Sequence, residues 1–368
     1  MRKATIGIDC RLGGVRHGGI GRYIAEYLHS VVRLSDHNFS LVFSDLEQQR
    51  ELLDAVTTVH RSRIQTTIAD VRHYSVAEQL QLPALFNSLP IDVLHVPHFN
   101  VPLGYRRPFV VTIHDLLWHT TTGTTVTTLP TWQYWLKYAG YRVIVSNAIN
   151  RAKKIFTPTQ FVADSIGEHY SQALDKMVVT YEGASSIFVP AAQVKRNNKQ
   201  LLYVGSLYPH KNVRVILDAL IDLPEYSLQI VGARDAFTES FKKEVHQLGL
   251  DARVSIKTKV SDRELVTLYQ QAAALIQPST SEGFGLTGIE ALACGTPLLA
   301  SDIAVFHEVY QEAALFFNPK DPHSLVDALD QLPNTDTLRH RGSVKEALTQ
   351  CSWDGMTQRI LTSIESTL

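Results

Sequence analysis

Two glutamates that flank a glycine-rich turn are the side chains with the clearest capacity for chemistry. Glu282 and Glu290 lie eight residues apart in the run Ser279–Glu290, which follows a short apolar stretch. Backbone N–H groups at a helix N-terminus favour an anion, and carboxylates accept hydrogen bonds from hydroxyl groups. An alternative needs no ligand, because Thr287 and Glu290 also have the spacing of a capping box. Local spacing therefore leaves both roles open for Glu290.

A second cluster combines a loop with a lysine. Residues 205–212 follow the apolar run Leu201–Val204 and include Ser206 and Lys211. A lysine at the start of a helix suits a diphosphate, because its ammonium acts as a point charge beside oriented N–H groups. The alternative is an ordinary solvated surface lysine.

A third cluster is rich in glycine. Gly18, Gly19 and Gly21 stand between the first predicted strand and a helix, where glycine lets the backbone approach a phosphate closely. Gly19-x-Gly21, with Asp45 just past the second strand, also matches part of a dinucleotide-binding fingerprint, although Ile24 occupies the third glycine position. A loop that binds no ligand is the remaining alternative.

The fourth cluster is a histidine at the end of an apolar run. His114 follows residues 110–113, where it would hydrogen-bond a substrate hydroxyl or a developing charge, or serve as a satisfied core group. His95, His98 and His119 raise the question of a metal site. No carboxylate or cysteine stands at ligand spacing from them, so we expect no metal.

The elements that must position these clusters follow a regular pattern. Short runs rich in Val and Ile, each followed by a turn and a longer segment of helical period, predict βαβ units and parallel sheets. All four clusters follow a predicted strand, and ligands bind outside the carboxyl ends of such strands. We therefore expect two doubly wound α/β domains whose clusters face one cleft. The predicted strands are Thr5–Asp9, Phe39–Phe43, Val93–Val96, Phe109–Ile113, Lys154–Thr157, Val178–Tyr181, Leu201–Val204, Leu228–Val231, Val254–Ile256, Ala274–Ile276, Leu298–Ala300 and Leu315–Phe317.

A polar stretch divides the two sets of strands. Residues 193–200, with Pro190 shortly before them, predict a boundary between an N-terminal domain of residues 1–189 and a C-terminal domain of residues 199–354. The last segment, residues 355–368, has helical apolar spacing and is expected to pack back on the N-terminal domain.

Composition bounds the class of protein. The 368 residues, 45% of them hydrophobic, suffice for two cores and exclude a disordered chain. A net charge of −1 argues against a protein that grips nucleic acid through its phosphates. The three cysteines (Cys10, Cys294 and Cys351) form no CxxC pair, and no export signal or bilayer-spanning run is visible. We expect a cytoplasmic protein that could meet a membrane only at its surface.

These residues together resemble a known family. The run from Glu282 to Glu290 resembles the Glu-x7-Glu motif of the retaining glycosyltransferases of family 4, which have the two-domain GT-B fold. The resemblance implies transfer of a sugar from a nucleotide diphosphate donor with retention of configuration, without metal or other cofactor. Further segments agree in the same order: Gly18–Ile20, Thr112–Leu116, Ala152–Phe161, Tyr181–Gly183, Gly205–Asn212 and Ala291–Pro297.

The resemblance also implies how the phosphates are bound. Lys211 would neutralise the diphosphate, and Gly18 and Gly19 would approach it from the N-terminal domain. Ser206 stands where the family usually has Arg, so Arg22, His210 or a serine hydroxyl would have to replace that cation. Thr287 stands in place of the common Pro and keeps a backbone donor beside the phosphate.

Sugar and nucleoside contacts are implied in the same way. Glu290 would bind the ribose hydroxyls, Glu282 would orient the transferred sugar, and His114 would contact that sugar from the opposite wall. The acceptor's proton would go to the departing phosphate oxygen during front-face attack. The remaining implied contacts come from Phe284, Gly285 and Leu286 for the sugar, and from Val231 and Val260 for the nucleobase.

The variant Gly-Ser-x-x-Pro-x-Lys-Asn at 205–212 looks most like members that use guanosine diphosphate sugars. We therefore predict transfer of a hexose, with mannose from GDP-mannose as the best candidate, to a glycan or lipid-linked acceptor in polysaccharide or glycoconjugate biosynthesis. The alternatives are a UDP-sugar-dependent member of the family, a nucleotide-sugar epimerase or phosphorylase, and a non-catalytic binding protein of the same fold.

The N-terminal domain should hold the acceptor information. Residues 132–142 are rich in Trp and Tyr and carry Lys137 and Arg142, which fits either core packing or an interfacial helix on an anionic membrane. The threonine-rich residues 120–128 are expected to form a mobile loop at the cleft.

Overall fold

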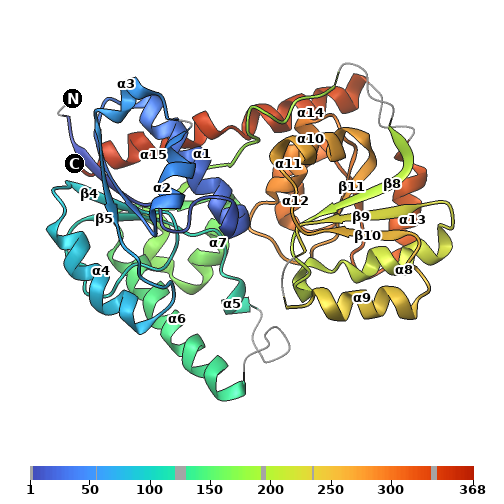
Figure 1. The fold of residues 1–368 in the computed structure, drawn as a ribbon, viewed down its shortest axis with the longest axis horizontal. Coiled ribbons are helices and arrows are strands. Elements are labelled where there is room, and N and C mark those ends of the chain that lie inside the picture. Colours follow the sequence, from blue (N-terminus) through green and yellow to red (C-terminus); the bar gives the residue numbers. More distant parts are fainter. Residues whose placement is uncertain (1–2, 55, 121–129, 192–195, 234–235, 333–337) are drawn as a thin grey trace. The chain divides into compact units, whose positions relative to one another are not determined.

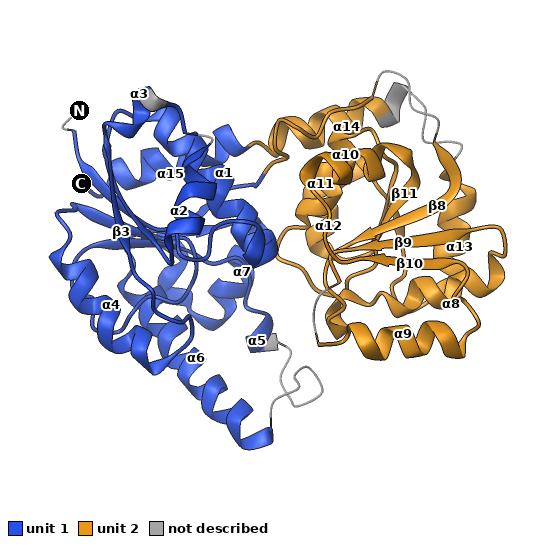
Figure 2. Cartoon of the chain, in the orientation of Figure 1, with its two compact units in different colours: residues 1–120, 129–182, 353–368 blue, residues 121–128, 183–352 orange. Residues whose placement is uncertain are grey.

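The computed structural model describes residues 3–54, 56–120, 130–191, 196–233, 236–332 and 338–368. The chain forms two compact units, shown in different colours in Figure 2. Unit 1 comprises residues 1–120, 129–182 and 353–368, and unit 2 comprises residues 121–128 and 183–352. The change of unit at Glu182 lies upstream of the polar stretch 193–200 that marked the boundary in the sequence. The threonine-rich residues 121–128 lie outside the described residues.

Unit 1 is built on a seven-stranded parallel sheet with the order β3-β2-β1-β4-β5-β6-β7. Neighbouring strands run parallel, as in the pairing of Ile8 with Leu41 on one side and with His95 on the other. The strand order reverses between β1 and β4, so this is the switch point of a doubly wound sheet. The strands are β1 (Thr5–Asp9), β2 (Asn38–Phe43), β3 (Ile64–Ile68), β4 (Val93–Val96), β5 (Phe109–Thr112), β6 (Ile155–Thr157) and β7 (Met177–Val179).

Strand β3 is the one element of this sheet that the apolar runs did not predict. Its sequence is Ile-Gln-Thr-Thr-Ile, and it pairs with β2 alone at the edge of the sheet. Edge strands are partly exposed, so they do not need the continuous apolar run that marks a buried parallel strand. The interior strands β4 and β5 are buried throughout and lie within their predicted runs.

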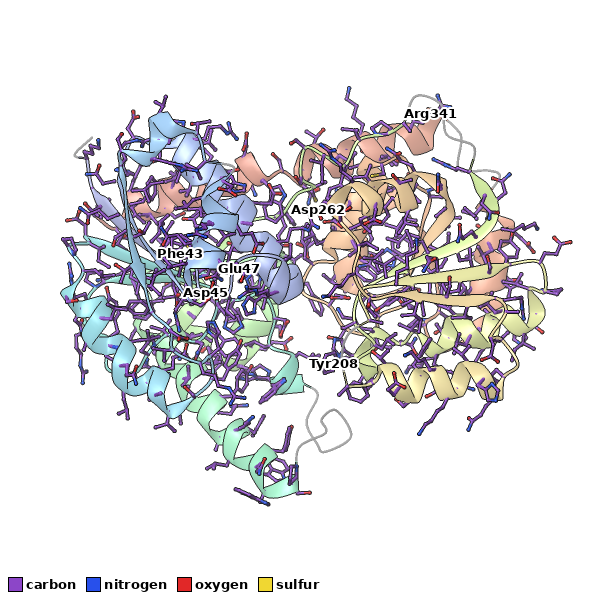
Figure 3. All side chains as sticks on the ribbon, in the orientation of Figure 1. Phe43, Asp45, Glu47, Tyr208, Asp262 and Arg341 are labelled. Carbon is purple, nitrogen blue, oxygen red and sulfur yellow. The ribbon has the colours of Figure 1, made fainter. Side chains whose placement is uncertain are left out.

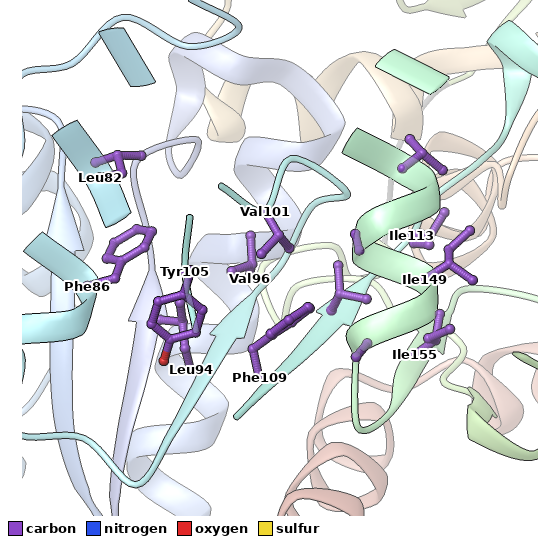
Figure 4. Packing of buried hydrophobic residues seen from close by; sticks show 14 of the residues in the cluster. Leu82, Phe86, Leu94, Val96, Val101, Tyr105, Phe109, Ile113, Ile149 and Ile155 are labelled. Atoms are coloured by element: carbon purple, nitrogen blue, oxygen red, sulfur yellow. The ribbon is translucent and has the colours of Figure 1, made fainter. Parts of the chain in front are cut away.

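Helices cover both faces of this sheet (Figure 1). A core cluster joins Leu94 and Val96 of β4 to Phe86 of α4 and Ile149 of α6, as Figure 4 shows. Because successive strand residues point to opposite faces, His95 lies on the other side of the sheet, beside α1. The helices are α1 (Gly18–Leu34), α2 (Leu46–Asp54), α3 (Thr58–Arg61), α4 (Val76–Ser88), α5 (Leu117–Thr120), α6 (Thr131–Arg151), α7 (Gln160–His169) and α15 (Trp353–Glu365).

The C-terminal helix α15 belongs to unit 1 although it follows the whole of unit 2. Its apolar side, including Trp353 and Ile360, is buried. Asp354 accepts a hydrogen bond from Ser30 of α1 at 3.0 Å and also pairs with Arg33. The helix therefore packs beside α1.

Unit 2 contains a six-stranded parallel sheet with the order β10-β9-β8-β11-β12-β13. The switch point of this second doubly wound sheet lies between β8 and β11. Strand β8 begins at Asn197, so the end of the polar stretch 193–200 is the exposed start of a strand and not a linker. The strands are β8 (Asn197–Val204), β9 (Ser227–Val231), β10 (Val254–Lys257), β11 (Ala272–Gln277), β12 (Leu298–Ser301) and β13 (Leu315–Phe317).

Two helices of unit 2 begin at residues whose side chains satisfy a first-turn N–H group. Ser261 and Glu264 form a capping box at α10, and Asp321 caps α13 ahead of Pro322. A second apolar cluster, which includes Ile216 and Ile230, fills the core of this unit. The helices are α8 (Arg214–Asp222), α9 (Thr238–Gln247), α10 (Asp262–Gln271), α11 (Leu286–Ala293), α12 (Ala304–Tyr310), α13 (Pro322–Asp330) and α14 (Leu338–Gln350).

Candidate active-site residues in the two units

The two strands at the switch point of unit 2 each deliver one charged side chain of the predicted site. Lys211 follows β8 and Glu282 follows β11, its neighbour in the sheet. Their side chains meet, with Lys211 Nζ 2.6 Å from Glu282 Oε1. Both side chains keep part of their surface, 22% and 15%, so the ion pair remains within reach of a ligand.

The two loops that carry this pair are joined by their backbones. The N–H of Thr280 donates to the carbonyl of His210 at 2.8 Å. Asn212 adopts a left-handed conformation with φ 52°, and its amide donates to Pro278 O and Pro319 O. Ser279 Oγ donates to Glu282 Oε1 at 2.7 Å, so the carboxylate is also oriented from its own loop. The lysine and glutamate are therefore set on one fixed frame.

The start of α11 provides a second group of donors. Gly285 precedes the helix with φ +99°, and a Cβ there would lie 2.1 Å from the hydroxyl of Tyr310. No other residue fits this position, and the chain can then enter α11 with the N–H groups of Leu286 and Thr287 in its first turn. Phe284 and Gly285 are buried, and Leu286 and Thr287 are partly exposed. Such a helix start binds anionic groups well.

Glu290 lies one turn into α11 and is 2% exposed. The hydroxyl of Tyr269 donates to its Oε2 at 3.0 Å. The capping-box interpretation is wrong, because the residue before the helix is Gly285 and no side chain caps it. Thr287 lies inside the helix, where its hydroxyl accepts a hydrogen bond from Gln277.

The remaining predicted residues of unit 2 follow the adjacent strands. Val231 ends β9, where its carbonyl accepts from Gly205 N–H at 2.9 Å. Ser206 follows β8, and its carbonyl accepts from Tyr203. Val260 is partly exposed in the loop after β10. All three lie at the carboxyl ends of their strands.

Unit 1 places two exposed glycines at the start of α1. A Cβ at Gly18 or Gly19 would meet no atom within 4 Å, whereas one at Gly21 would lie 1.9 Å from Gly14 O. Gly21 is therefore required by packing, and Gly19, which has no left-handed φ, is not. Glycine weakens a helix by roughly 1 kcal/mol relative to alanine. Neither packing nor backbone conformation therefore explains why position 19 is a glycine. The open backbone at Gly19 is suited to the approach of a ligand.

Asp45, labelled in Figure 3, does not fit the dinucleotide interpretation. Its carboxylate accepts from Gln48 N–H at 2.8 Å, at the start of α2, and pairs with Arg16 at 2.9 Å. Asp45 therefore caps α2, and this role accounts for the residue without a ribose ligand.

His114 follows β5 and is held by three other segments of unit 1. Its Nε2 is 3.1 Å from Pro97 O, and its Nδ1 is 3.4 Å from Glu182 Oε1. The ring of Tyr23 from α1 packs edge-on at 4.6 Å between centroids. Glu182 was not among the predicted site residues, although the segment Tyr181–Gly183 carried part of the family resemblance.

The other histidines of the metal hypothesis are dispersed. His95 Nε2 pairs with Thr112 at 2.9 Å, and the nitrogens of His119 pair with Tyr141 and Tyr170. Burial, with a smaller effect of His114, lowers the pKa of His95 to about 3. No group of three or more metal-ligating side chains occurs in the part of the chain that the structure describes.

A buried ionic network that the sequence did not reveal joins the loop after β1 to the start of α4. Arg11 is 1% exposed and makes two hydrogen bonds of 2.8 Å to Asp9 and one of 2.9 Å to Glu78. Glu78 also accepts the N–H of Tyr74, whose φ of 57° is unusual for a bulky residue. The network fixes the loops that follow β1 and β3.

Two family models match the chain almost end to end. "Glycosyltransferase Family 4" matches residues 17–185, and "Glycosyl transferases group 1" matches residues 188–345. The chain belongs to the family 4, or group 1, glycosyltransferases. This family membership argues against the dinucleotide-binding interpretation of the glycine loop.

Two curated relatives of this glycosyltransferase are mannosyltransferases. The chain is 37% identical over 199 residues to the O-antigen chain mannosyltransferase RfbU of Salmonella typhimurium, a match that covers 53% of this chain and 56% of the relative. It is 25% identical over 346 residues to the O-antigen chain mannosyltransferase B of Escherichia coli, covering 89% of this chain and 83% of the relative. The first match thus spans little more than half of RfbU.

Solved structures confirm the GT-B fold. HepE of Anabaena, crystallised with UDP and glucose, aligns with a TM-score of 0.76 at 19% identity over 99% of this chain and all of the other. WaaG, described as a glycosyltransferase involved in lipopolysaccharide biosynthesis, aligns with a TM-score of 0.70 at 15% identity over 94% of both chains. The predicted fold class of two doubly wound α/β domains is therefore correct.

Proposed function

We propose that this glycosyltransferase transfers mannose from GDP-mannose to a glycan or lipid-linked acceptor, with retention of configuration and without a metal ion. The two O-antigen mannosyltransferase relatives support the choice of sugar. The observation that carries the catalytic part is the partly exposed Lys211–Glu282 pair at the switch point of unit 2, beside the start of α11.

Unit 2 has the groups that such a donor requires. We assign the diphosphate to Lys211 and to the N–H groups at the start of α11, and the ribose hydroxyls to Glu290. Glu282 would orient the transferred sugar together with the backbone of residues 284–286. The nucleobase would lie near Val231 and Val260. The structure of HepE with UDP and glucose supports a nucleotide sugar as the class of donor.

The proposed reaction needs no external base. The acceptor oxygen forms the new bond to the anomeric carbon as the bond to the phosphate oxygen breaks, and the acceptor's proton passes to that phosphate oxygen. Lys211 and the oriented dipoles at the start of α11 stabilise the charge that develops on the leaving diphosphate. His114 and Gly19, from unit 1, take part in the same reaction, His114 at the sugar and Gly19 at the phosphates.

A donor panel tests this proposal directly. Purified protein is incubated with GDP-mannose, UDP-glucose, UDP-galactose or UDP-N-acetylglucosamine in the presence of EDTA, with lipid extract as the source of acceptor, and release of GDP or UDP is followed. We expect release from GDP-mannose and no effect of the chelator. Release from a UDP-sugar alone would replace the donor and keep the family activity. Loss of activity on chelation that magnesium restores would overturn the metal-independent mechanism.

We also propose that α6 of unit 1 contacts the cytoplasmic face of an anionic membrane. No described helix is long and apolar enough to cross a bilayer. Helix α6 has two apolar sides. The first side, with Tyr134, Tyr141 and Val145, is buried, so core packing explains part of the aromatic content of this helix. The second side is exposed at helical spacing, and consists of Trp132, Trp135, Leu136, Ala139, Gly140 and Val143.

Charge favours a lipid surface as the partner of this exposed side. Helix α6 contains no acidic residue, and Lys137 and Arg142 are exposed beside the apolar side. Tryptophan rings are favoured at the level of the lipid headgroups, and nearby basic side chains are attracted to anionic lipid.

Vesicle binding tests this surface. The double substitution Trp132→Ser with Trp135→Ser should lower binding to phosphatidylglycerol-containing vesicles by about tenfold or more, because two interfacial rings are lost. Ile221→Ser, which removes an exposed apolar residue from α8 in unit 2, is the matched control. Equal binding of wild type and double variant would refute a membrane role for α6.

A further inference from the structure

Glu182 is an acidic side chain that lies beside the proposed catalytic histidine. It follows β7, is 6% exposed, and places its Oε1 3.4 Å from His114 Nδ1. The two side chains come from loops after different strands of the unit 1 sheet, so their approach reflects the fold and not their separation in the sequence. His114 retains 14% of its side-chain surface and can still be reached by a ligand.

Both nitrogens of the His114 ring face hydrogen-bond acceptors. Nε2 lies 3.1 Å from the carbonyl oxygen of Pro97, and Nδ1 faces the carboxylate of Glu182. A carbonyl oxygen and an ionised carboxylate can only accept, whereas a neutral imidazole carries a single N–H. The surroundings are therefore complementary to a ring that is protonated at both nitrogens.

The other titratable groups around His114 leave Glu182 as its counter-ion. From β4 and the loop after it, His95 and His98 are buried, and burial lowers the pKa of both, so they are neutral at neutral pH. From α1, Tyr23 presents the edge of its ring, and burial raises its pKa, so it is neutral as well. Asp115, on the same loop as His114, is exposed, and its carboxylate caps the N–H of Leu117.

We propose that Glu182 is a positioning residue that holds His114 as a doubly protonated imidazolium, so that His114 acts as a hydrogen-bond donor and a positive charge and not as a general base. This inference rests on the proposed function, which places His114 at the donor sugar. It agrees with a reaction in which the acceptor's proton goes to the leaving diphosphate, because an imidazolium has no free lone pair to receive it. A substrate oxygen that takes the place of Pro97 O would accept the hydrogen bond from Nε2–H.

Ring protonation can be measured without any turnover. In protein labelled with nitrogen-15 histidine, the His114 signals, assigned by their loss in His114→Gln, should show two protonated ring nitrogens at pH 7. In Glu182→Gln the same ring should lose one proton at this pH, because the carboxylate that favours the charged form is gone. A wild-type ring with a single proton at pH 7 would overturn the inference even if the enzyme is active.

Turnover gives the second, independent measurement. Glu182→Gln should lower kcat for donor turnover by about tenfold, equivalent to ~1.4 kcal/mol, with little change in KM. On the alkaline side, the activity of Glu182→Gln should begin to fall at a lower pH than the activity of wild type. Without the carboxylate, His114 loses its second ring proton at a lower pH. If His114 were a general base, the enzyme would instead lose activity on the acid side, where the ring is protonated. That result would refute the inference.

Controls separate this inference from folding and from the proposed function. Glu168→Gln removes an exposed carboxylate from α7 in the same unit and should behave as wild type. Glu182→Asp keeps the charge and should retain the alkaline limit of wild type, and thermal unfolding reports whether either variant at 182 is folded. A wild-type protein that releases no nucleotide from any sugar donor would end the proposed function, while the ring measurement would still decide the protonation of His114.

Discussion

Replacing Lys211 by methionine is expected to lower kcat/KM for the sugar nucleotide by about 10²- to 10³-fold. The ammonium is the cation at the switch point of unit 2, and it lies 2.6 Å from Glu282 on a backbone fixed by Asn212. A preorganised charge that meets the leaving diphosphate stabilises the transition state more than the ground state. Steady-state release of nucleotide from the active donor measures the loss.

Nucleotide binding separates the phosphate role from a general disturbance of the unit. Calorimetric titration of Lys211→Met should show a weaker affinity for GDP and an unchanged affinity for guanosine, because only GDP carries the diphosphate. Lys243→Met removes an exposed lysine from α9 and should match wild type in both titrations. Equal losses for GDP and guanosine would contradict the diphosphate role.

The buried strands could be predicted because parallel sheets covered on both faces require continuous apolar runs. The runs at 5–9 and 93–96 agree with β1 and β4 to the residue. The same reasoning fails where exposure changes the pattern. Edge strand β3 has three consecutive polar residues between its two isoleucines, and the exposed start of β8 is polar enough to look like a linker.

The candidate site was predictable one loop at a time and not as a set of contacts. Glycine turns and charged residues after strands identify the loops, because the carboxyl ends of parallel strands meet at one edge of a sheet. The ion pair between Lys211 and Glu282 joins residues 71 positions apart and follows from the adjacency of β8 and β11, which no local pattern contains. Glu182 lacked any local motif, so only its distance from His114 identified it.

The outcome at α11 illustrates how one residue type decides between two local interpretations. Thr287 and Glu290 have the spacing of a capping box, but Gly285 takes the position before the helix with a positive φ that favours glycine. The helix therefore starts one residue before Thr287, and Glu290 turns into the unit to meet Tyr269. Glu290 therefore does not cap α11, which supports the proposal that its carboxylate binds the ribose hydroxyls.

The second large effect is expected at the other half of the ion pair. Glu282→Gln should lower kcat for donor turnover by about 10²-fold, because the amide keeps the shape of the side chain and loses the charge that orients Lys211 and the sugar. Unlike Lys211→Met, this variant should not weaken GDP binding. Without the carboxylate the ammonium is no longer neutralised, so the affinity for GDP should stay the same or increase.

A double-mutant cycle tests whether Lys211 and Glu282 act together. If Lys211 and Glu282 act as a unit, the double variant should lose far less than the product of the two single losses in kcat/KM, since each single change already removes the shared arrangement. Glu346→Gln on α14 removes an exposed carboxylate from unit 2 and serves as the control. Losses that multiply would mean that the two side chains act separately, and weaker GDP binding in Glu282→Gln would mean that the carboxylate serves the nucleotide and not the sugar.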